Sequence, residues 1–490
     1  MGIALVVIYS IFAVFIFFYS MVQLSLVIVY LKNRKKIANQ VSEPMNIEDL
    51  PHVTLQLPIF NELYVIERLI DAVANFNYPK EKLEIQILDD STDETVEVVK
   101  KRVKHWRDKG LDIVQVIRPD RVGFKAGALD YGMNNCKGEF IAIFDADFVP
   151  EKDFLLKTIP YFRDDKIGVV QTKWEHLNKN YSLITKLQAF ALDAHFTVEQ
   201  GGRNRSNHFI NFNGTAGVWR KQTIIDGGGW KADTLTEDLD LSYRSQLKGW
   251  KFLYLENVGS PAELPAEMNA LKSQQFRWMK GGAECLVKNA GRVTSSDYNL
   301  WTKINAIFHL MNSSIFIAVL SVALISIPLF ILKHNNPSYD LFFQVATFSL
   351  FSFGVIGLLY FTSFAKGYKN KLIALIHFIY YFPLFLSFSM GLSLHNAIAV
   401  SEGYAGKKSP FIRTPKFNLT NKDGSWKGNK YTKIKLNWIN VGEIFLTLYF
   451  IFGIYLSFKW GDFAMLPFFA MLTLGFGAIS YFSLKHSYAK

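Results

Sequence analysis

The feature that most constrains the fold of this chain is a set of long apolar runs on either side of a polar middle. Residues 3–31 contain no charged side chain, and comparable runs follow residue 304 in a chain of 490 residues. Runs of this length exceed what a globular core helix needs and match a bilayer span. Residues 39–292 have ordinary polar composition. The sequence therefore predicts a membrane protein with a soluble domain between its spans.

The basic residues predict how the chain is oriented. The net charge is +12, and four basic residues cluster within 32–36, directly after the first run. Positive-inside bias places the N-terminus outside and the soluble domain in the cytoplasm. A cleaved signal peptide fits poorly, because the run is too long and has no basic segment before it. No nucleic-acid partner is expected, since basic residues facing anionic lipid account for the charge. Cys136 and Cys285 lack metal-ligand spacing, as expected in a reducing compartment.

The soluble domain alternates short apolar runs with helical patterns. Strands are predicted at 53–57, 84–88, 113–117, 140–144 and 167–171, with helices at 63–76, 94–107, 125–135 and 181–200 between or after them. This alternation indicates a doubly wound, mostly parallel sheet. No G-x-G-x-x-G follows the first strand, which argues against a dinucleotide-binding oxidoreductase.

Acidic residues stand where the predicted strands end. The run Phe140–Phe144 stops at Asp145-Ala146-Asp147, and 84–88 stops at Asp89-Asp90. Ligands bind beyond the carboxyl ends of strands in open α/β sheets. Two such carboxylates can hold a hard divalent cation that in turn binds phosphate oxygens. The alternative is a solvated acidic turn. The two interpretations are distinguished by whether the rest of the chain supplies the other residues that such a site needs.

Two further segments are candidates for such a site. Thr236-Glu237-Asp238 opens a predicted helix, where a carboxylate is either a cap or a general base. Gln274, Arg277 and Trp278 share one face of a predicted helix over 267–288. Arg offers a rigid fork for phosphate and Trp a flat platform for a sugar, although an interfacial helix carries both residues as well.

One helical pair and two glycine-rich loops complete the candidates. His195 and Glu199 lie one turn apart, and a hydrogen-bonded pair is favoured over a metal site because no third ligand is close in sequence. The loops at 214–217 and 227–229 would let a backbone approach a substrate.

Together these motifs resemble the membrane-integrated, inverting family-2 glycosyltransferases, which include cellulose synthases, cellulose-synthase-like mannan and glucan synthases, and hyaluronan and chitin synthases. The matching segments, in family order, are Phe60-Asn61-Glu62, Asp89-Asp90, Lys125-Ala126-Gly127, Asp145-Ala146-Asp147, Thr236-Glu237-Asp238 and Gln274 with Arg277-Trp278. The residue sequence of these motifs most resembles that of the mannan and glucan synthase-like branch. The resemblance covers nearly the whole chain and implies an α/β fold of the GT-A type, inserted between about five spans and interfacial helices.

The resemblance also implies a role for each matching residue. The nucleoside would be lined by Asn61, Glu62, Asp89 and Asp90, and the nucleotide's sugar and phosphates would be contacted by Lys125 and Asp145. Mg²⁺ or Mn²⁺ would be held by Asp147 with Asp145, and the leaving pyrophosphate by Gln274 and Arg277. Trp278 would stack under the acceptor sugar, and Asp238, beside Glu237, would be the general base. Inverting transfer is one displacement, so one base faces the acceptor while metal and Arg offset the charge on the diphosphate.

The C-terminal half adds a gating-like loop over 401–436. Phe411, Thr414 and Lys416 match the F-x-V-T-x-K segment that closes over the nucleotide in cellulose synthase, whereas Arg413 stands where that pattern has Val. A Pro- and Lys-rich connector is the alternative interpretation.

A loop over the nucleotide must lie on the cytoplasmic side, and this constrains the topology. Although hydropathy favours a span at 372–399, we expect an interfacial or re-entrant segment broken at Pro383 and Gly391. The five expected spans are 3–31, 304–332, 341–364, 438–458 and 464–484. The domains are then 1–38 (first span and basic stop), 39–292 (cytoplasmic GT-A domain with an interfacial helix) and 293–490 (membrane region with the loop).

These implications favour a metal-dependent hexosyltransferase that uses a UDP- or GDP-hexose to extend a β-linked polysaccharide, expected to be β-1,4, and extrudes it. The alternative is transfer of one sugar to a lipid, as in ceramide glucosyltransferase. A third reading is an inactive scaffold or transporter, against which the intact acid, base and leaving-group set argues. The expected partners are the nucleotide sugar, a glycan or lipid acceptor and membrane lipid, with accessory subunits left open.

Overall fold

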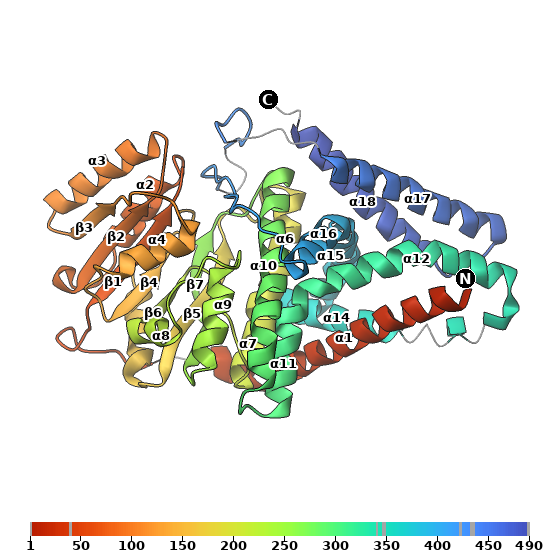
Figure 1. The fold of residues 1–490 in the computed structure, drawn as a ribbon, viewed down its shortest axis with the longest axis horizontal. Coiled ribbons are helices and arrows are strands. Elements are labelled where there is room, and N and C mark those ends of the chain that lie inside the picture. The colour runs from red at the N-terminus through yellow and green to blue at the C-terminus, as the bar shows by residue number, and fades with distance from the viewer. Residues whose placement is uncertain are drawn as a thin grey trace.

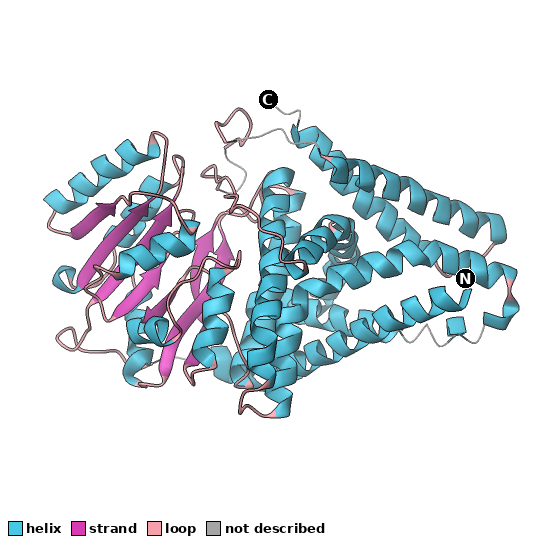
Figure 2. Ribbon diagram, viewed as in Figure 1, coloured by secondary structure: helices cyan, strands magenta, loops and turns pink. Residues whose placement is uncertain are grey.

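The computed structural model describes residues 2–38, 42–339, 342–344, 349–420, 424–431 and 437–487. The expected span at 341–364 and the loop at 401–436 therefore lie partly outside the described residues. Figure 1 shows a sheet-containing unit at one end and long helices at the other, and Figure 2 shows that all the strands belong to the first unit.

The sheet has seven strands in the order β3-β2-β1-β4-β6-β5-β7. The strands are β1 (Val53–Ile59), β2 (Leu83–Asp89), β3 (Asp112–Val116), β4 (Phe140–Ile143), β5 (Ile167–His176), β6 (Gly217–Arg220) and β7 (Lys251–Ala262). Strands β1 to β4 pair in parallel, β6 is antiparallel to β4 and β5, and β7 is parallel to β5. The five predicted strands and the mostly parallel sheet are confirmed. The other two were missed, because β6 is short and a register shift interrupts β7.

Helices cover both faces of this sheet and bury its apolar residues. One face packs against α2 (Ile66–Ala74), α3 (Thr95–Asp108) and α5 (Phe154–Thr158), and the other against α4 (Phe124–Met133), α8 (Lys221–Asp226) and α9 (Glu237–Gln246). Strands buried on both faces read as continuous apolar runs, which is why β1, β2 and β4 were visible in the sequence.

A layer of helices joins the sheet unit to the long helices. It contains α6 (Leu183–Ala194), a π-helical turn (His195–Glu199), α7 (Gln200–Arg205), α10 (Met268–Thr294), α11 (Leu300–Leu310) and α16 (Ser393–Tyr404). The predicted helix over 181–200 is thus interrupted by a π-turn. Helix α10 extends beyond the predicted 267–288 and lies between the sheet unit and the bundle (Figure 1).

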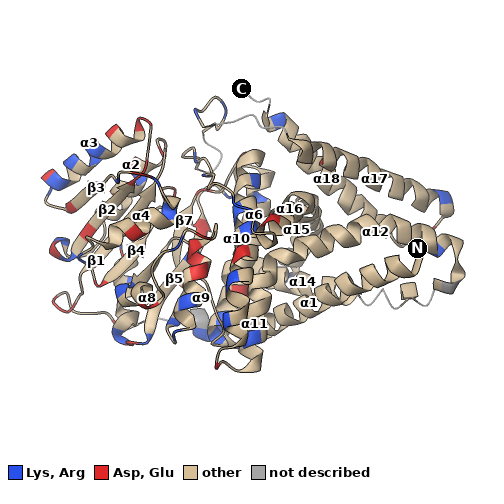
Figure 3. Cartoon of the chain, viewed as in Figure 1, with Lys and Arg blue, Asp and Glu red and all other residues tan. Residues whose placement is uncertain are grey.

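Six described helices or helix pairs are long and apolar enough to cross a membrane. They are α1 (Gly2–Ala38), α11 continued by α12 (Ile315–Asn335), α14 (Ser349–Phe364), α15 (Lys371–Gly391), α17 (Trp438–Trp460) and α18 (Leu466–Ser487). Figure 3 shows the long helices almost free of charged residues, which gather in the sheet unit and on α10. The protein is therefore a multi-pass membrane protein.

Helix α15 differs from the expected interrupted segment. It continues through Pro383 and ends at Gly391, so the break expected at the proline is wrong and a sixth candidate span appears. Phe378 and Phe385 both pack against Phe190 of α6, which holds the helix together around the proline. In Figure 1, α15 and α16 run close to the line of sight, across the long helices.

A close backbone approach holds α15 in this position. A Cβ atom added at Gly475 of α18 would lie 2.0 Å from the carbonyl oxygen of Ser387, and one added at Gly391 would lie 2.3 Å from the oxygen of Gly475. Only glycines let the two helices cross at this distance, so the crossing point is specified by residue type.

Candidate active site

Three neighbouring strand ends form the floor of the site. Strands β2, β1 and β4 are adjacent and parallel, so the segments after them lie at one edge of the sheet. The chain leaves β1 for β2 on one side and returns as β4 on the other. This is the switch point at which open α/β sheets bind ligands.

Two of the predicted nucleoside residues shape this edge and do not line the cavity. Asp89 is buried and accepts hydrogen bonds from the Ser91 amide (2.9 Å) and Gln115 Nε2 (2.7 Å). Asn61 has φ 55° and donates its amide to Ser91 Oγ at 2.9 Å. These residues tie the ends of β1 and β2 together.

The other two predicted nucleoside residues line the cavity, and each is paired with an arginine. Both carboxylate oxygens of Asp90 accept from Arg118, at 2.7 and 2.6 Å. Glu62 Oε2 accepts from Arg413 NH1 at 2.7 Å, and burial raises the pKa of Glu62 to about 8 although Arg413 opposes the shift. Sequence analysis missed Arg118, since nothing in its local pattern marks it.

The predicted metal residues lie directly after β4 and each contacts a lysine. Lys125 Nζ lies 2.5 Å from Asp145 Oδ1, and Lys416 Nζ lies 2.8 Å from Asp147 Oδ2. Burial lowers the pKa of Lys125, but the carboxylates of Asp145 and Glu237 outweigh it and raise the pKa overall.

These two carboxylates fit a cation that is shared with a substrate. Among the described residues, no group of three or more His, Cys, Asp or Glu could hold a metal on its own. Mg²⁺ is commonly bound by one or two carboxylates plus substrate phosphates. Asp145 and Asp147 supply that kind of incomplete ligand set.

The predicted base lies at the start of α9. Burial, and then the charge of Glu237, raise the pKa of Asp238 to about 7, and burial also raises the pKa of Glu237. Gly214 packs against this carboxylate with φ +78°, and a Cβ there would lie 3.0 Å from Asp238 Oδ2. A carboxyl with a pKa near neutral is suited to accept a proton in general base catalysis.

Helix α10 presents Gln274, Arg277 and Trp278 to the same cavity. Arg277 donates to the Ile412 carbonyl and to Thr414 Oγ1 (3.0 Å), and burial lowers its pKa to about 10, so it stays charged. The Trp278 ring lies 6.4 Å from the ring of Trp174, which sequence analysis did not single out. The shared face predicted for the α10 residues is confirmed.

The loop after α16 covers the cavity. Phe411 stacks on Phe124 at 6.2 Å, and the Arg277 guanidinium lies 4.6 Å from the Phe411 ring. Beyond the loop's lysine, the amides of Phe417 and Leu419 donate to Glu263 at 2.9 and 3.2 Å. The predicted matching residues therefore lie over the strand ends, and Glu263 anchors the loop to the end of β7.

Two cavities meet at Asp238, the predicted general base. The first, of about 180 Å³, is lined by the acids, Lys125, the α10 residues and the loop. The second, of about 620 Å³, continues between α1, α12, α14, α15 and α18. Asp238, Gln274, Trp278 and Trp174 line both. His195 and Glu199 line the second cavity and are hydrogen-bonded to each other at 2.8 Å, as predicted for this pair.

Comparison with known proteins matches this architecture. Residues 51–281 match the family described as Glycosyltransferase like family 2. The chain is 43% identical over 275 residues to the probable glucomannan 4-beta-mannosyltransferase 2 of Oryza sativa subsp. japonica, covering 55% of this chain and 47% of the relative. It is 42% identical over 264 residues to glucomannan 4-beta-mannosyltransferase 9 of Arabidopsis thaliana, covering 53% and 50%. The chain thus spans about half the length of the curated relatives it matches.

A solved structure shares the fold. A mannosyltransferase from Pyrobaculum calidifontis, in complex with GDP-Man and Mn²⁺, superposes with a TM-score of 0.55 at 17% identity, covering 82% of this chain and all of that one. The sheet topology and this likeness show a fold of the GT-A type. The match to the family-2 glycosyltransferases covers residues 51–281, and the relatives to which the chain is similar include glucomannan 4-beta-mannosyltransferases.

Proposed function

We propose that this protein is an inverting, metal-dependent hexosyltransferase that extends a β-1,4-linked polysaccharide and passes it through its own helices. The observation that carries the proposal is the second cavity, which begins at Asp238 and Trp278 and continues between the long helices. An enzyme that adds one sugar to a soluble acceptor needs no such space. A growing glycan does.

The lining of this cavity suits a sugar chain. The lining is mainly apolar and includes the aromatic rings of Phe316 and Phe353, and polar groups of Tyr19, Gln23 and Asn312 also line it. Flat apolar rings can stack against sugar faces, while amide and hydroxyl groups can bond sugar hydroxyls. The cavity reaches Phe468, in the first turn of α18, at the end of the bundle far from the sheet (Figure 1).

In the proposed reaction Asp238 takes the proton from the acceptor hydroxyl as that oxygen attacks the anomeric carbon from the face opposite the diphosphate. Trp278 supports the acceptor sugar from α10. Arg277 and Gln274 hold the departing diphosphate, and Arg277 offsets its charge in a buried setting where such charge is strongly felt. A divalent cation held by Asp145 and Asp147 would supply further positive charge at the phosphates.

The donor proposed is GDP-mannose. The relatives named above are mannosyltransferases, and the neighbour of the same fold was solved with GDP-Man and Mn²⁺. In this proposal Asp90 and Glu62 line the nucleoside pocket as carboxyl groups that are already paired, Asp90 with Arg118 and Glu62 with Arg413.

The proposed topology keeps five spans, with the N-terminus outside, the family-2 domain cytoplasmic and α15 interfacial. Two features of α15 support this arrangement: its aromatic residues over two turns contact α6 of the domain, and its end meets the middle of α18. A helix along the bundle would touch the domain with one end only. The loop from Phe411 to Lys416 then stays on the side of the nucleotide.

The test is to incubate the purified protein in lipid nanodiscs with labelled GDP-mannose, GDP-glucose or UDP-glucose and Mg²⁺ or Mn²⁺, and to size the product. A polymer cut by a β-1,4-endomannanase is expected with GDP-mannose and is absent with Asp238→Asn. A single-sugar glycolipid would replace the polysaccharide proposal by the lipid-acceptor alternative. Absence of transfer from every donor would refute both.

A further inference from the structure

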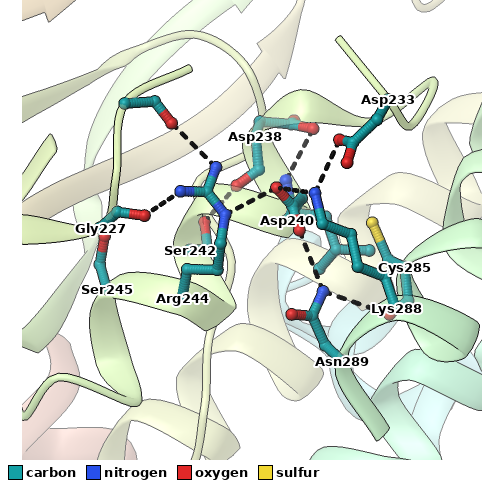
Figure 4. A network of polar contacts seen from close by, with 12 residues as sticks. Gly227, Asp233, Asp238, Asp240, Ser242, Arg244, Ser245, Cys285, Lys288 and Asn289 are labelled. Carbon is teal, nitrogen blue, oxygen red and sulfur yellow. Dashed lines mark hydrogen bonds and ion pairs between the residues drawn. The ribbon is translucent and has the colours of Figure 1, made fainter. Parts of the chain in front are cut away.

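A network of charged groups joins the helix that carries the base to the helix that carries the acceptor platform. Asp240, two residues after Asp238 on α9, has no exposed surface. Its carboxylate accepts from Arg244 Nε (2.8 Å), Lys288 Nζ (2.9 Å) and Asn289 Nδ2 (3.1 Å). Figure 4 shows Lys288 and Asn289 of α10 pointing toward Asp240.

Asp240 remains charged in this network. Burial raises its pKa, but Arg244 and the α10 groups outweigh burial and lower it overall. A buried carboxylate is tolerated only when it is paired and hydrogen-bonded. Arg244 also donates to the carbonyls of Gly227 and Gly229, the latter at 2.9 Å, so the glycine-rich loop before α9 is tied into the same network.

The segment before the base is held by α10 and not by its own cap. Helix α9 begins without a side-chain cap bond at Thr236. Instead the amide of Leu235 donates to Glu284 Oε2 at 2.7 Å, and Thr236 packs on Gly281, where an added Cβ would lie 2.5 Å from Thr236 Cγ2. The start of α9 therefore depends on α10 for its position.

These contacts lie along one stripe of α10. Residues 281, 284, 285, 288 and 289 follow one another at intervals of three or four from 274, 277 and 278. Residues so spaced share one side of a helix. The first turns of this stripe face the leaving group and acceptor, and the later turns face the segment of the base, so one rigid helix places both halves of the reaction.

We propose that Asp240, Arg244, Lys288 and Asn289 form a clamp that positions Asp238 relative to Gln274, Arg277 and Trp278, with Lys288 its principal tie between the two helices. The inference rests on the proposed function. A general base acts only within hydrogen-bond reach of its proton, and a misplacement of about 1 Å can cost about 10²-fold in rate. Lys288 is a positioning residue, because it contacts neither Asp238 nor the cavity.

The clamp predicts a particular defect. If Asp238 is displaced from the acceptor hydroxyl, sugar transfer slows, while the donor site between the strand ends and the loop is unchanged. Water reaching the bound donor then competes better with the acceptor. The ratio of donor hydrolysis to transfer should rise, which a general loss of folded protein cannot cause.

The experiment compares Lys288→Met, Lys288→Arg and the control Lys303→Met in nanodiscs. Methionine keeps much of the apolar stem and leaves Asp240 with two partners, so the variant should fold. Lys303 lies on α11 and donates to the Thr294 carbonyl at 2.9 Å. Transfer kcat, donor KM, hydrolysis and melting temperature are measured for each.

We expect Lys288→Met to lower transfer kcat by about 10- to 100-fold, to leave donor KM within about twofold and to raise the hydrolysis-to-transfer ratio several-fold. Lys288→Arg should recover most of the transfer, and Lys303→Met should match the parent. The clamp is wrong if Lys288→Met transfers normally, or if transfer, hydrolysis and melting temperature fall together. An inactive parent would refute the proposed function instead, so the two failures are distinguishable.

Discussion

At the scale of single residues, burial sets the chemistry of the site. Asp238 and Glu237 are two adjacent carboxyls in a buried pocket, and burial is the main reason that both pKa values are raised. The charge of Glu237 adds to the rise at Asp238, and the charge of Asp145 adds to the rise at Glu237. Lys125 lies against the same carboxylates and stays charged. One cluster thus contains a base, Asp238, whose pKa is near neutral, and a cation, Lys125, that can bind phosphate.

The raised pKa of Asp238 predicts a pH dependence. A general base must be ionised, so kcat/KM should fall as pH drops below about 7 and level off above it. Asp238→Asn should lower the rate by about 10²- to 10⁴-fold and abolish this limb. Initial rates between about pH 5 and 9, at saturating metal, test it. A limb that persists in Asp238→Asn would assign it to another group.

Gly214 offers a second prediction, because its backbone and its neighbour both exclude a side chain. Gly214→Ala should lower transfer by about tenfold, since the new methyl would meet Asp238 Oδ2 at 3.0 Å. Gly249→Ala is the matched control: it has φ +93° and no atom within 4 Å of its added Cβ. Both variants carry similar backbone strain, so equal activity in the two would refute the contact with Asp238.

At the scale of elements, the loop after α16 contacts the domain through a charged residue that the similar segment of cellulose synthase does not have. Arg413, which stands where the cellulose synthase segment has Val, donates to Glu62 and the Asn61 carbonyl and lies 4.5 Å from the Tyr431 ring. In this chain the loop is therefore held over the strand ends by the hydrogen bonds of Arg413 as well as by Phe411 and Thr414.

Arg413→Val tests this difference. Removing the guanidinium leaves Glu62 buried without its partner, which costs several-fold more than loss of an exposed pair. We expect protease cleavage of the loop to accelerate and GDP affinity to fall by about tenfold. Lys408→Val, on the same connector and exposed, should change neither. If the loop of the Arg413→Val protein is cleaved no faster than that of the parent, the contact between Arg413 and Glu62 does not hold the loop.

At the scale of the whole molecule, the position of α15 depends on two glycines. The crossing of α15 and α18 brings Gly475 against the Ser387 carbonyl, with no room for a Cβ. The same crossing closes one side of the second cavity, since Phe385 and Met471 both line it.

Gly475→Leu should therefore separate α15 from α18. We expect a melting temperature lowered by several degrees and shorter products, because the cavity wall is displaced. Gly354→Leu, in a membrane helix where an added Cβ meets nothing within 4 Å, is the control. Fluorescence-detected thermal unfolding and product sizing measure both effects. A Gly475→Leu protein as stable as the control would contradict the close crossing.

Local patterns were enough to predict much of this protein. The acids after β2 and β4, the stripe of Gln274, Arg277 and Trp278, and the long apolar runs are all short-range features whose spacing reflects strand or helix geometry. They predicted the α/β sheet, its edge as the site and the membrane helices. The proline in α15 misled, since an apolar helix packed by aromatic neighbours can accommodate it.

Tertiary structure alone decided the partners. Arg413 and Glu62 lie 351 positions apart, and Lys288 and Asp240 lie 48 apart, so no local spacing links either pair. The hydrogen bonds of Asp89 and Asn61 across the ends of β1 and β2, the crosswise path of α15 and the meeting of the two cavities at Asp238 have the same origin. The sequence by itself determined which elements form and which residues can do chemistry, because both depend on neighbours a few positions away. Packing between distant segments determined which of those residues meet and which charges are neutralised.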